Sequence, residues 1–191
     1  MKKIVLFLFS ICFLTNVFAG GQQYESLKEE TRHMMSQSIS DVAPNINSFT
    51  NETEKTIWIA KQGNKLIKKI PDENIRKELL TSIHYEATRA GLEPELILGI
   101  IQVESGFKKY AISSVGARGY MQVMPFWVDI IGEKTHNLFH LRTNLRYGCT
   151  ILRHYLDIEK GNLFRTLGRY NGSLGKSSYP NAVFQATKNY Q

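Results

Sequence analysis

Apolar residues recur with the period of an α-helix along most of this chain, and this periodicity restricts the fold more than any other feature. Two of the periodic segments begin with a proline followed by acidic residues, which favour helix N-termini, and one ends at Gly91. No alternating strand pattern of convincing length and no repeat interrupts them. The sequence therefore predicts a mainly α-helical fold, with its loops gathered between about residues 106 and 142. The periodic segments are TEKTIWIAKQGNKLIKKI, PDENIRKELLTSIHYEATRAG, EPELILGIIQVESGF, TNLRYGCTILRHYLDIEKGN and the shorter NLFRTLGRYNGS.

The first residues, MKKIVLFLFSICFLTNVFAG, have the three-part plan of a secretory signal peptide. Two lysines precede an apolar run from Ile4 to Leu14, and small residues lie near Ala19. A membrane anchor is the alternative, but the run is shorter than the ~20 residues that a bilayer-spanning helix requires. We expect cleavage after Ala19, export to the bacterial periplasm or cell envelope, and no stable membrane span afterwards.

Composition divides the chain into three parts. The signal peptide occupies residues 1–19. Residues 20–53 are polar, contain turn-forming residues and have little sustained periodicity, which predicts an arm or linker. The periodic segments fill residues 54–191, which we expect to form one folded domain.

The segment ELILGIIQVESGF places an acid on the apolar side of its helix. Ile97, Ile100 and Ile101 precede Glu104 by seven, four and three residues, so all four share one face. Burial beside isoleucines and a position near the carboxyl end of a helix both raise the pKa of a carboxyl group. A carboxyl that keeps its proton near neutral pH can act as a general acid. The alternative is a structural acid that turns to solvent or pairs with Lys108.

The residues after Glu104 favour the catalytic interpretation. The stretch ESGFKKYAISSVGARGYMQVMPFW combines glycines, hydroxyls, a glutamine and methionines, a composition suited to a groove wall. Its ESGF and GARGYMQVMP runs resemble the signature of the soluble lytic transglycosylase family. Two later segments, NLFHLRTNLRYGCTILRHYL and LGRYNGSLGKSSYPNAV, are similar to further family segments in the same order. The resemblance covers about residues 75–190 and implies a lysozyme-like α-helical domain with a substrate groove.

This resemblance implies a reaction that uses one carboxyl group. Glu104 would protonate the oxygen between N-acetylmuramic acid and N-acetylglucosamine in peptidoglycan. Its carboxylate would then take a proton from the muramic C6 hydroxyl, which attacks its own anomeric carbon and gives a 1,6-anhydromuramoyl end. By matching position, Tyr170 is the tyrosine expected to approach the catalytic carboxyl. The residues implied to bind the sugars are Ser113, Gln122, Met124, Tyr170 and Asn171.

Two other functions stay open at this point. A lysozyme-like muramidase would use the same acid while water intercepts the intermediate, and a non-catalytic peptidoglycan-binding module of a secretion system would keep only the groove. The GYMQVMP run and the intact Glu104 favour the lytic transglycosylase. The net charge of +7 suits an anionic polymer, but no basic and aromatic pattern supports nucleic-acid binding. We expect peptidoglycan strands as substrate, no cofactor and no metal, and leave a cell-envelope or secretion assembly open as a partner.

Overall fold

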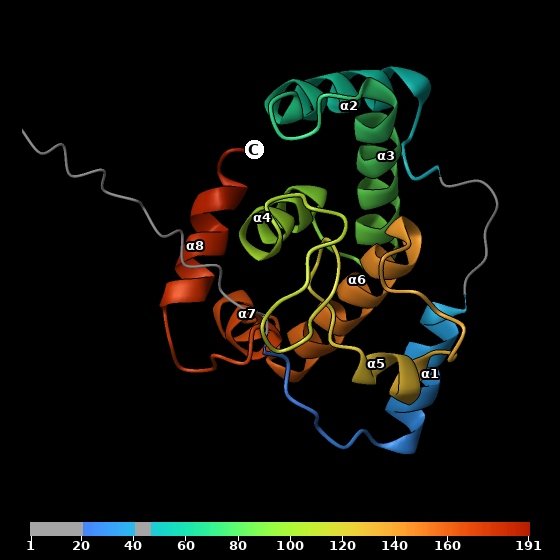
Figure 1. Ribbon diagram of the computed structural model, residues 1–191, viewed down its shortest axis with the longest axis vertical. Helices are drawn as coiled ribbons and strands as arrows, with labels where there is room; N and C mark the ends of the chain where they lie inside the picture. The colour runs from blue at the N-terminus through green and yellow to red at the C-terminus, as the bar shows by residue number, and fades with distance from the viewer. Residues whose placement is uncertain (1–20, 41–46) are drawn as a thin grey trace, which may run out of the picture.

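The computed structural model describes residues 21–40 and 47–191, and the regular elements of these residues are helices (Figure 1). Two isolated β-bridges, Ile112–Arg118 and Arg118–Val123, lie between α4 (Pro94–Glu104) and α5 (Phe126–Ile131). The prediction of a mainly α-helical fold is confirmed. No helix in these two ranges has the length and apolar character needed to cross a membrane. The expected signal peptide at residues 1–19 and its cleavage after Ala19 lie outside the described residues.

Five helices coincide with the five periodic segments. Three of them begin at a side-chain cap. The side chain of Asn51 accepts a hydrogen bond from the backbone amide of Glu54, and the side chains of Asp72 and Asn162 each accept one from the amide three residues later. These caps explain why the helices begin where they do, because each satisfies a backbone N–H that has no partner inside the helix. The helices are α2 (Glu52–Leu66), α3 (Glu73–Arg89), α4 (Pro94–Glu104), α6 (Leu141–Ile158) and α7 (Leu163–Tyr170).

Three further helices have too weak a pattern to be predicted: α1 (Glu29–Ile39), α5 (Phe126–Ile131) and α8 (Ser178–Thr187). Helix α1 lies in the polar segment for which composition predicts an arm or linker. Only Met35 and Ile39 of α1 are buried, and the helix packs against α6 and α5. Two buried residues are too few to produce the repeating apolar pattern from which a helix is predicted. In α8, Pro180 sits in the first turn, where its missing N–H removes no helical hydrogen bond.

Helix α4 occupies the centre of the domain and packs against α8 and α3 (Figure 1). Its isoleucines are fully buried in the hydrophobic core. The approach of α8 is close because Gly99 has no side chain: a Cβ there would lie 2.2 Å from Thr187 Oγ1 and 2.9 Å from the Thr187 backbone nitrogen. The antiparallel contact brings the first turn of α8 to the carboxyl end of α4, where Glu104 lies.

Candidate active site

Glu104 is the last residue of α4, and its side chain is 1% exposed. Ile97, Ile100 and Ile101 are fully buried, so the apolar face that the sequence predicts is confirmed. The carboxyl group neither turns to solvent nor pairs with Lys108. Burial raises the pKa of Glu104 from 4.5 to about 8, and a hydrogen bond from Tyr179 opposes this shift only in part. The carboxyl group therefore keeps its proton at neutral pH.

Tyr179 of α8 is the side chain that orients this carboxyl group. Its hydroxyl donates a hydrogen bond to Glu104 Oε1 at 2.5 Å, and both residues are buried. The other oxygen, Glu104 Oε2, is buried without a hydrogen-bond partner in the described part of the chain. Since Oε1 accepts from Tyr179, Oε2 is the oxygen that can carry the acidic proton.

Tyr179 is therefore the tyrosine that hydrogen-bonds to Glu104, whereas the family resemblance implies Tyr170 as the tyrosine that approaches it. Tyr170, at the end of α7, donates its hydroxyl hydrogen to the Met121 carbonyl oxygen at 2.8 Å and so supports the loop after α4. Tyr179 lies nine residues later, in the segment YNGSLGKSSYPNAV that carries the resemblance. The segment that contains Tyr179 could thus be found from the sequence, but the sequence pattern does not indicate which of its two tyrosines hydrogen-bonds to the acid.

The loop between α4 and α5 is fixed mainly by Asn144 of α6. Asn144 Oδ1 accepts a hydrogen bond from the Met121 amide at 2.8 Å, and Nδ2 donates to the carbonyl oxygens of Arg118 and Leu138, also at 2.8 Å. Gly119 has a φ of +75°, and a Cβ there would lie 2.4 Å from Asn144 Nδ2. The loop thus approaches α6 as closely as a backbone without a side chain allows.

Two of the predicted sugar-binding residues also organise this loop. Gln122 is buried, and its Nε2 donates to the carbonyl oxygens of Gly119 at 2.9 Å and Ala111 at 3.1 Å. Ser113 is half-buried, and its hydroxyl oxygen accepts from the Ala117 amide at 3.0 Å. These contacts fix the shape of the loop, and a role of either side chain in sugar binding stays a prediction.

The remaining predicted residues lie where this loop meets the end of α7. Met124 is half-buried, and Asn171 is buried at the C-cap of α7. Asn171 Nδ2 has no hydrogen-bond partner among residues 21–40 and 47–191. The Tyr170–Met121 hydrogen bond joins the two segments, and the pKa of Tyr170 is raised first by burial and then by the charge that Glu104 carries once it ionises. The fold therefore joins the loop that carries Gln122 and Met124 to the end of α7, and a role of these residues in sugar binding stays a prediction.

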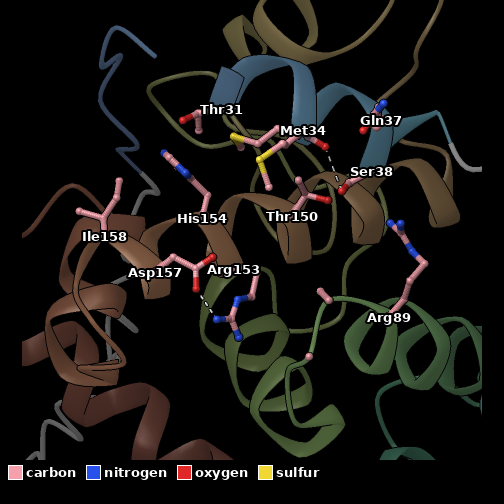
Figure 2. A pocket seen from close by; sticks show the side chains of 13 residues that line it. Thr31, Met34, Gln37, Ser38, Arg89, Thr150, Arg153, His154, Asp157 and Ile158 are labelled. Carbon is pink, nitrogen blue, oxygen red and sulfur yellow. Dashed lines mark hydrogen bonds and ion pairs between the residues drawn. The ribbon is translucent and has the colours of Figure 1, made fainter. Parts of the chain in front are cut away.

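A hollow of about 980 Å³ lies elsewhere, between α1 and α6 (Figure 2). Thr31 and Met34 of α1 face His154 of α6 across it, and Arg153 pairs with Asp157 on its wall. None of the predicted site residues lines this hollow. This hollow does not include the buried acid, and we place the candidate site at Glu104 on chemical grounds.

Residues 81–190 match the family model described as the transglycosylase SLT domain. This chain belongs to the transglycosylase SLT family. The match includes Glu104, Tyr179 and all the predicted sugar-binding residues, and it leaves α1 and α2 outside. In this SLT domain the site described above is therefore built from family segments.

Curated relatives agree with the family assignment. Membrane-bound lytic murein transglycosylase C of Haemophilus influenzae (strain PittGG) is 49% identical over 115 residues, which cover 52% of this chain and 32% of that protein. The transglycosylase of Enterobacteria phage PRD1 is 32% identical over 101 residues, which cover 49% of this chain and 37% of that protein. The SLT chain thus spans about a third of the length of these relatives. A solved structure of an inactive mutant of lytic transglycosylase Slt from Pseudomonas aeruginosa aligns at 24% identity with a TM-score of 0.46, over 58% of this chain and 21% of that one.

Proposed function

We propose that this chain is a lytic transglycosylase that cleaves peptidoglycan between N-acetylmuramic acid and N-acetylglucosamine without water and leaves 1,6-anhydro ends. The observation that carries the proposal is the buried, protonated Glu104, held by Tyr179 within an SLT domain. We also propose that the protein acts in the cell envelope, where its substrate lies. The expected signal peptide supports this placement, as does the similarity to membrane-bound lytic murein transglycosylase C.

The reaction needs two proton transfers at the same carboxyl group. Glu104 gives the proton on Oε2 to the glycosidic oxygen, and the bond from that oxygen to the anomeric carbon breaks. The carboxylate that forms is stabilised by the hydrogen bond from Tyr179. It then takes the proton of the muramic C6 hydroxyl as that oxygen bonds to the anomeric carbon, so Glu104 is protonated again at the end of the cycle.

A single acid fits this reaction better than ordinary hydrolysis, which uses a second carboxyl group as base or nucleophile. The pKa of Glu104 responds to burial and to Tyr179, and no second carboxylate in the described residues contributes to it. The substrate's own C6 hydroxyl supplies the missing nucleophile. Ser113, Gln122, Met124, Tyr170 and Asn171 are proposed to line the sugar sites. Gln122 Nε2 already donates hydrogen bonds to two backbone carbonyl oxygens, so we propose that Gln122 Oε1 is the atom that accepts a hydrogen bond from the sugar.

Product analysis tests this function directly. The exported protein is incubated with purified peptidoglycan, the products are treated with borohydride, and their masses are measured. We expect 1,6-anhydromuropeptides, because an anhydro end has no free anomeric carbon to reduce. Reduced muramic ends would identify a muramidase instead. A folded protein that releases no products would favour the binding-module alternative.

Replacing Tyr179 with phenylalanine is expected to slow turnover by about 10- to 100-fold and to change its pH dependence. The acid must be protonated, so turnover of the wild type falls as the pH rises through about 8. The Tyr179 hydrogen bond lowers the pKa of Glu104, and its loss moves this decline to higher pH. A pH–rate profile measures both effects.

Tyr190→Phe is the matched control for this prediction. Tyr190 is also buried, but its hydroxyl donates to Gln102 Oε1 at 2.6 Å and does not contact Glu104. Its removal should leave the alkaline decline where it is. A Tyr179→Phe profile that coincides with that of Tyr190→Phe would show that Tyr179 does not act on the acid.

A further inference from the structure

The chain segment before α1 contacts the loops of the candidate site. We call residues 21–25 the N-terminal strap. In Figure 1 the blue chain leaves the side of α7 and runs to the start of α1. Along this path the Gly21 amide donates to the Asn171 carbonyl oxygen at 3.1 Å, and the Tyr24 ring meets the edge of Phe126 with centroids 6.0 Å apart. The strap therefore touches both segments that carry the predicted sugar-binding residues.

Gln22 makes the central contact of the strap. Only 3% of its surface is exposed, although the residues that follow it are exposed. Its Oε1 accepts a hydrogen bond from the Met124 amide at 3.1 Å, and its Nε2 donates to the Gln122 carbonyl oxygen at 3.3 Å. One side-chain carboxamide thus satisfies the hydrogen-bonding capacity of a backbone N–H and a backbone C=O that lie two residues apart in the loop.

The acetamido groups of peptidoglycan sugars have the same hydrogen-bonding character as this side chain. Each offers one carbonyl acceptor and one N–H donor on a planar amide, which the Met124 amide and the Gln122 carbonyl can satisfy in the same way. On the basis of the proposed function, we propose that the strap competes with the glycan: Gln22 occupies the place of a substrate acetamido group, and the strap must leave before a strand binds there.

The remaining contacts fit a strap that can leave. No residue of the strap belongs to the buried hydrophobic core, so its release disrupts no core packing. Glu25 pairs with Arg169 at 2.6 Å, but the Glu25 side chain is 44% exposed, and exposed ion pairs contribute little. The strap passes close to Gly172, where a Cβ would lie 2.0 Å from the Gly21 carbonyl oxygen, and the φ of +71° at this residue also favours glycine. The strap is thus closely fitted but lightly attached.

The test compares Gln22→Met with Gln23→Met in the exported protein. Methionine matches glutamine in length and has neither the donor nor the acceptor, and Gln23 is an exposed neighbour. Binding of the N-acetylglucosamine trimer is measured by titration calorimetry, with the deacetylated glucosamine trimer as the second ligand. We expect Gln22→Met to bind the acetylated trimer about 10-fold more tightly, because the fraction of molecules with an open site increases. Gln23→Met should match the wild type, and the deacetylated trimer, which lacks the acetamido group, should bind each of the three proteins more weakly than the acetylated trimer does.

Thermal unfolding and product analysis complete the experiment. Gln22→Met should unfold at the wild-type temperature within a few degrees. Unchanged or weaker binding of the acetylated trimer by Gln22→Met, or a large loss of its stability, would overturn the proposal and make the strap a fixed part of the fold. Failure of the proposed function has a different signature, namely absence of anhydro products from every variant whatever the trimer affinities are.

Discussion

Replacing Glu104 with glutamine is expected to reduce peptidoglycan turnover by about 10³-fold or more. Glutamine cannot deliver the proton to the glycosidic oxygen, and it cannot accept the proton of the C6 hydroxyl. It keeps the size of the side chain and can still accept the hydrogen bond from Tyr179. The rate of anhydromuropeptide release by the purified variant measures the effect. Glu93→Gln, at the exposed N-cap of the same helix, is the control and should keep the wild-type rate.

The same substitution is expected to stabilise the protein at neutral pH. In the unfolded chain Glu104 ionises near pH 4.5, whereas in the folded protein burial holds its pKa at about 8. The folded state therefore loses stability, relative to the unfolded state, as the pH rises from about 4.5 to about 8. At pH 7 this loss of unfolding free energy is on the order of 3 kcal/mol, and it does not occur in the glutamine variant because glutamine does not ionise. Denaturation at pH 4 and pH 7 measures the difference, which should be small at pH 4. A glutamine variant that is less stable than the wild type at pH 7 would make Glu104 a structural residue.

Replacing Asn144 with leucine is expected to have the second-largest effect. Leucine has the same branching at Cγ but leaves the Met121 amide and the carbonyl oxygens of Arg118 and Leu138 without their partner. Each buried group that loses its hydrogen bond costs about 1–3 kcal/mol, so a loss of at least about 3 kcal/mol in unfolding free energy follows. Turnover should fall by about 100-fold, because Gln122 and Met124 lie on the same loop and small displacements of positioning groups have effects of this size.

Chemical denaturation and product release measure these two effects of Asn144→Leu. Asn181→Leu provides the control, because Asn181 is exposed on α8 and the same change there should alter neither stability nor turnover. Wild-type stability of Asn144→Leu would mean that the loop finds other partners for its backbone groups. In that case the positioning role that we assign to Asn144 would be wrong.

The sequence by itself determined the helices with a full periodic face and the unusual acid among them. Both depend on neighbours within two turns: Ile97, Ile100 and Ile101 place Glu104 on an apolar face whatever packs against it. The direction of its pKa shift follows from the same local surroundings. A helix such as α1, with only Met35 and Ile39 buried, has too little local signal and forms because α6 and α5 cover it.

The tertiary structure alone decided which side chains meet the acid. Tyr179 is 75 residues from Glu104 in the chain, Tyr170 is 49 from Met121, and Gln22 is 100 from Gln122. Such contacts depend on which helices pack together and at what distance. For example, α8 can approach α4 closely because Gly99 has no side chain. A hydrogen bond needs its two atoms placed to within a fraction of an ångström, and a linear pattern carries no such information. For this reason the sequence identified the acid, and only the folded chain identified its tyrosine and its strap.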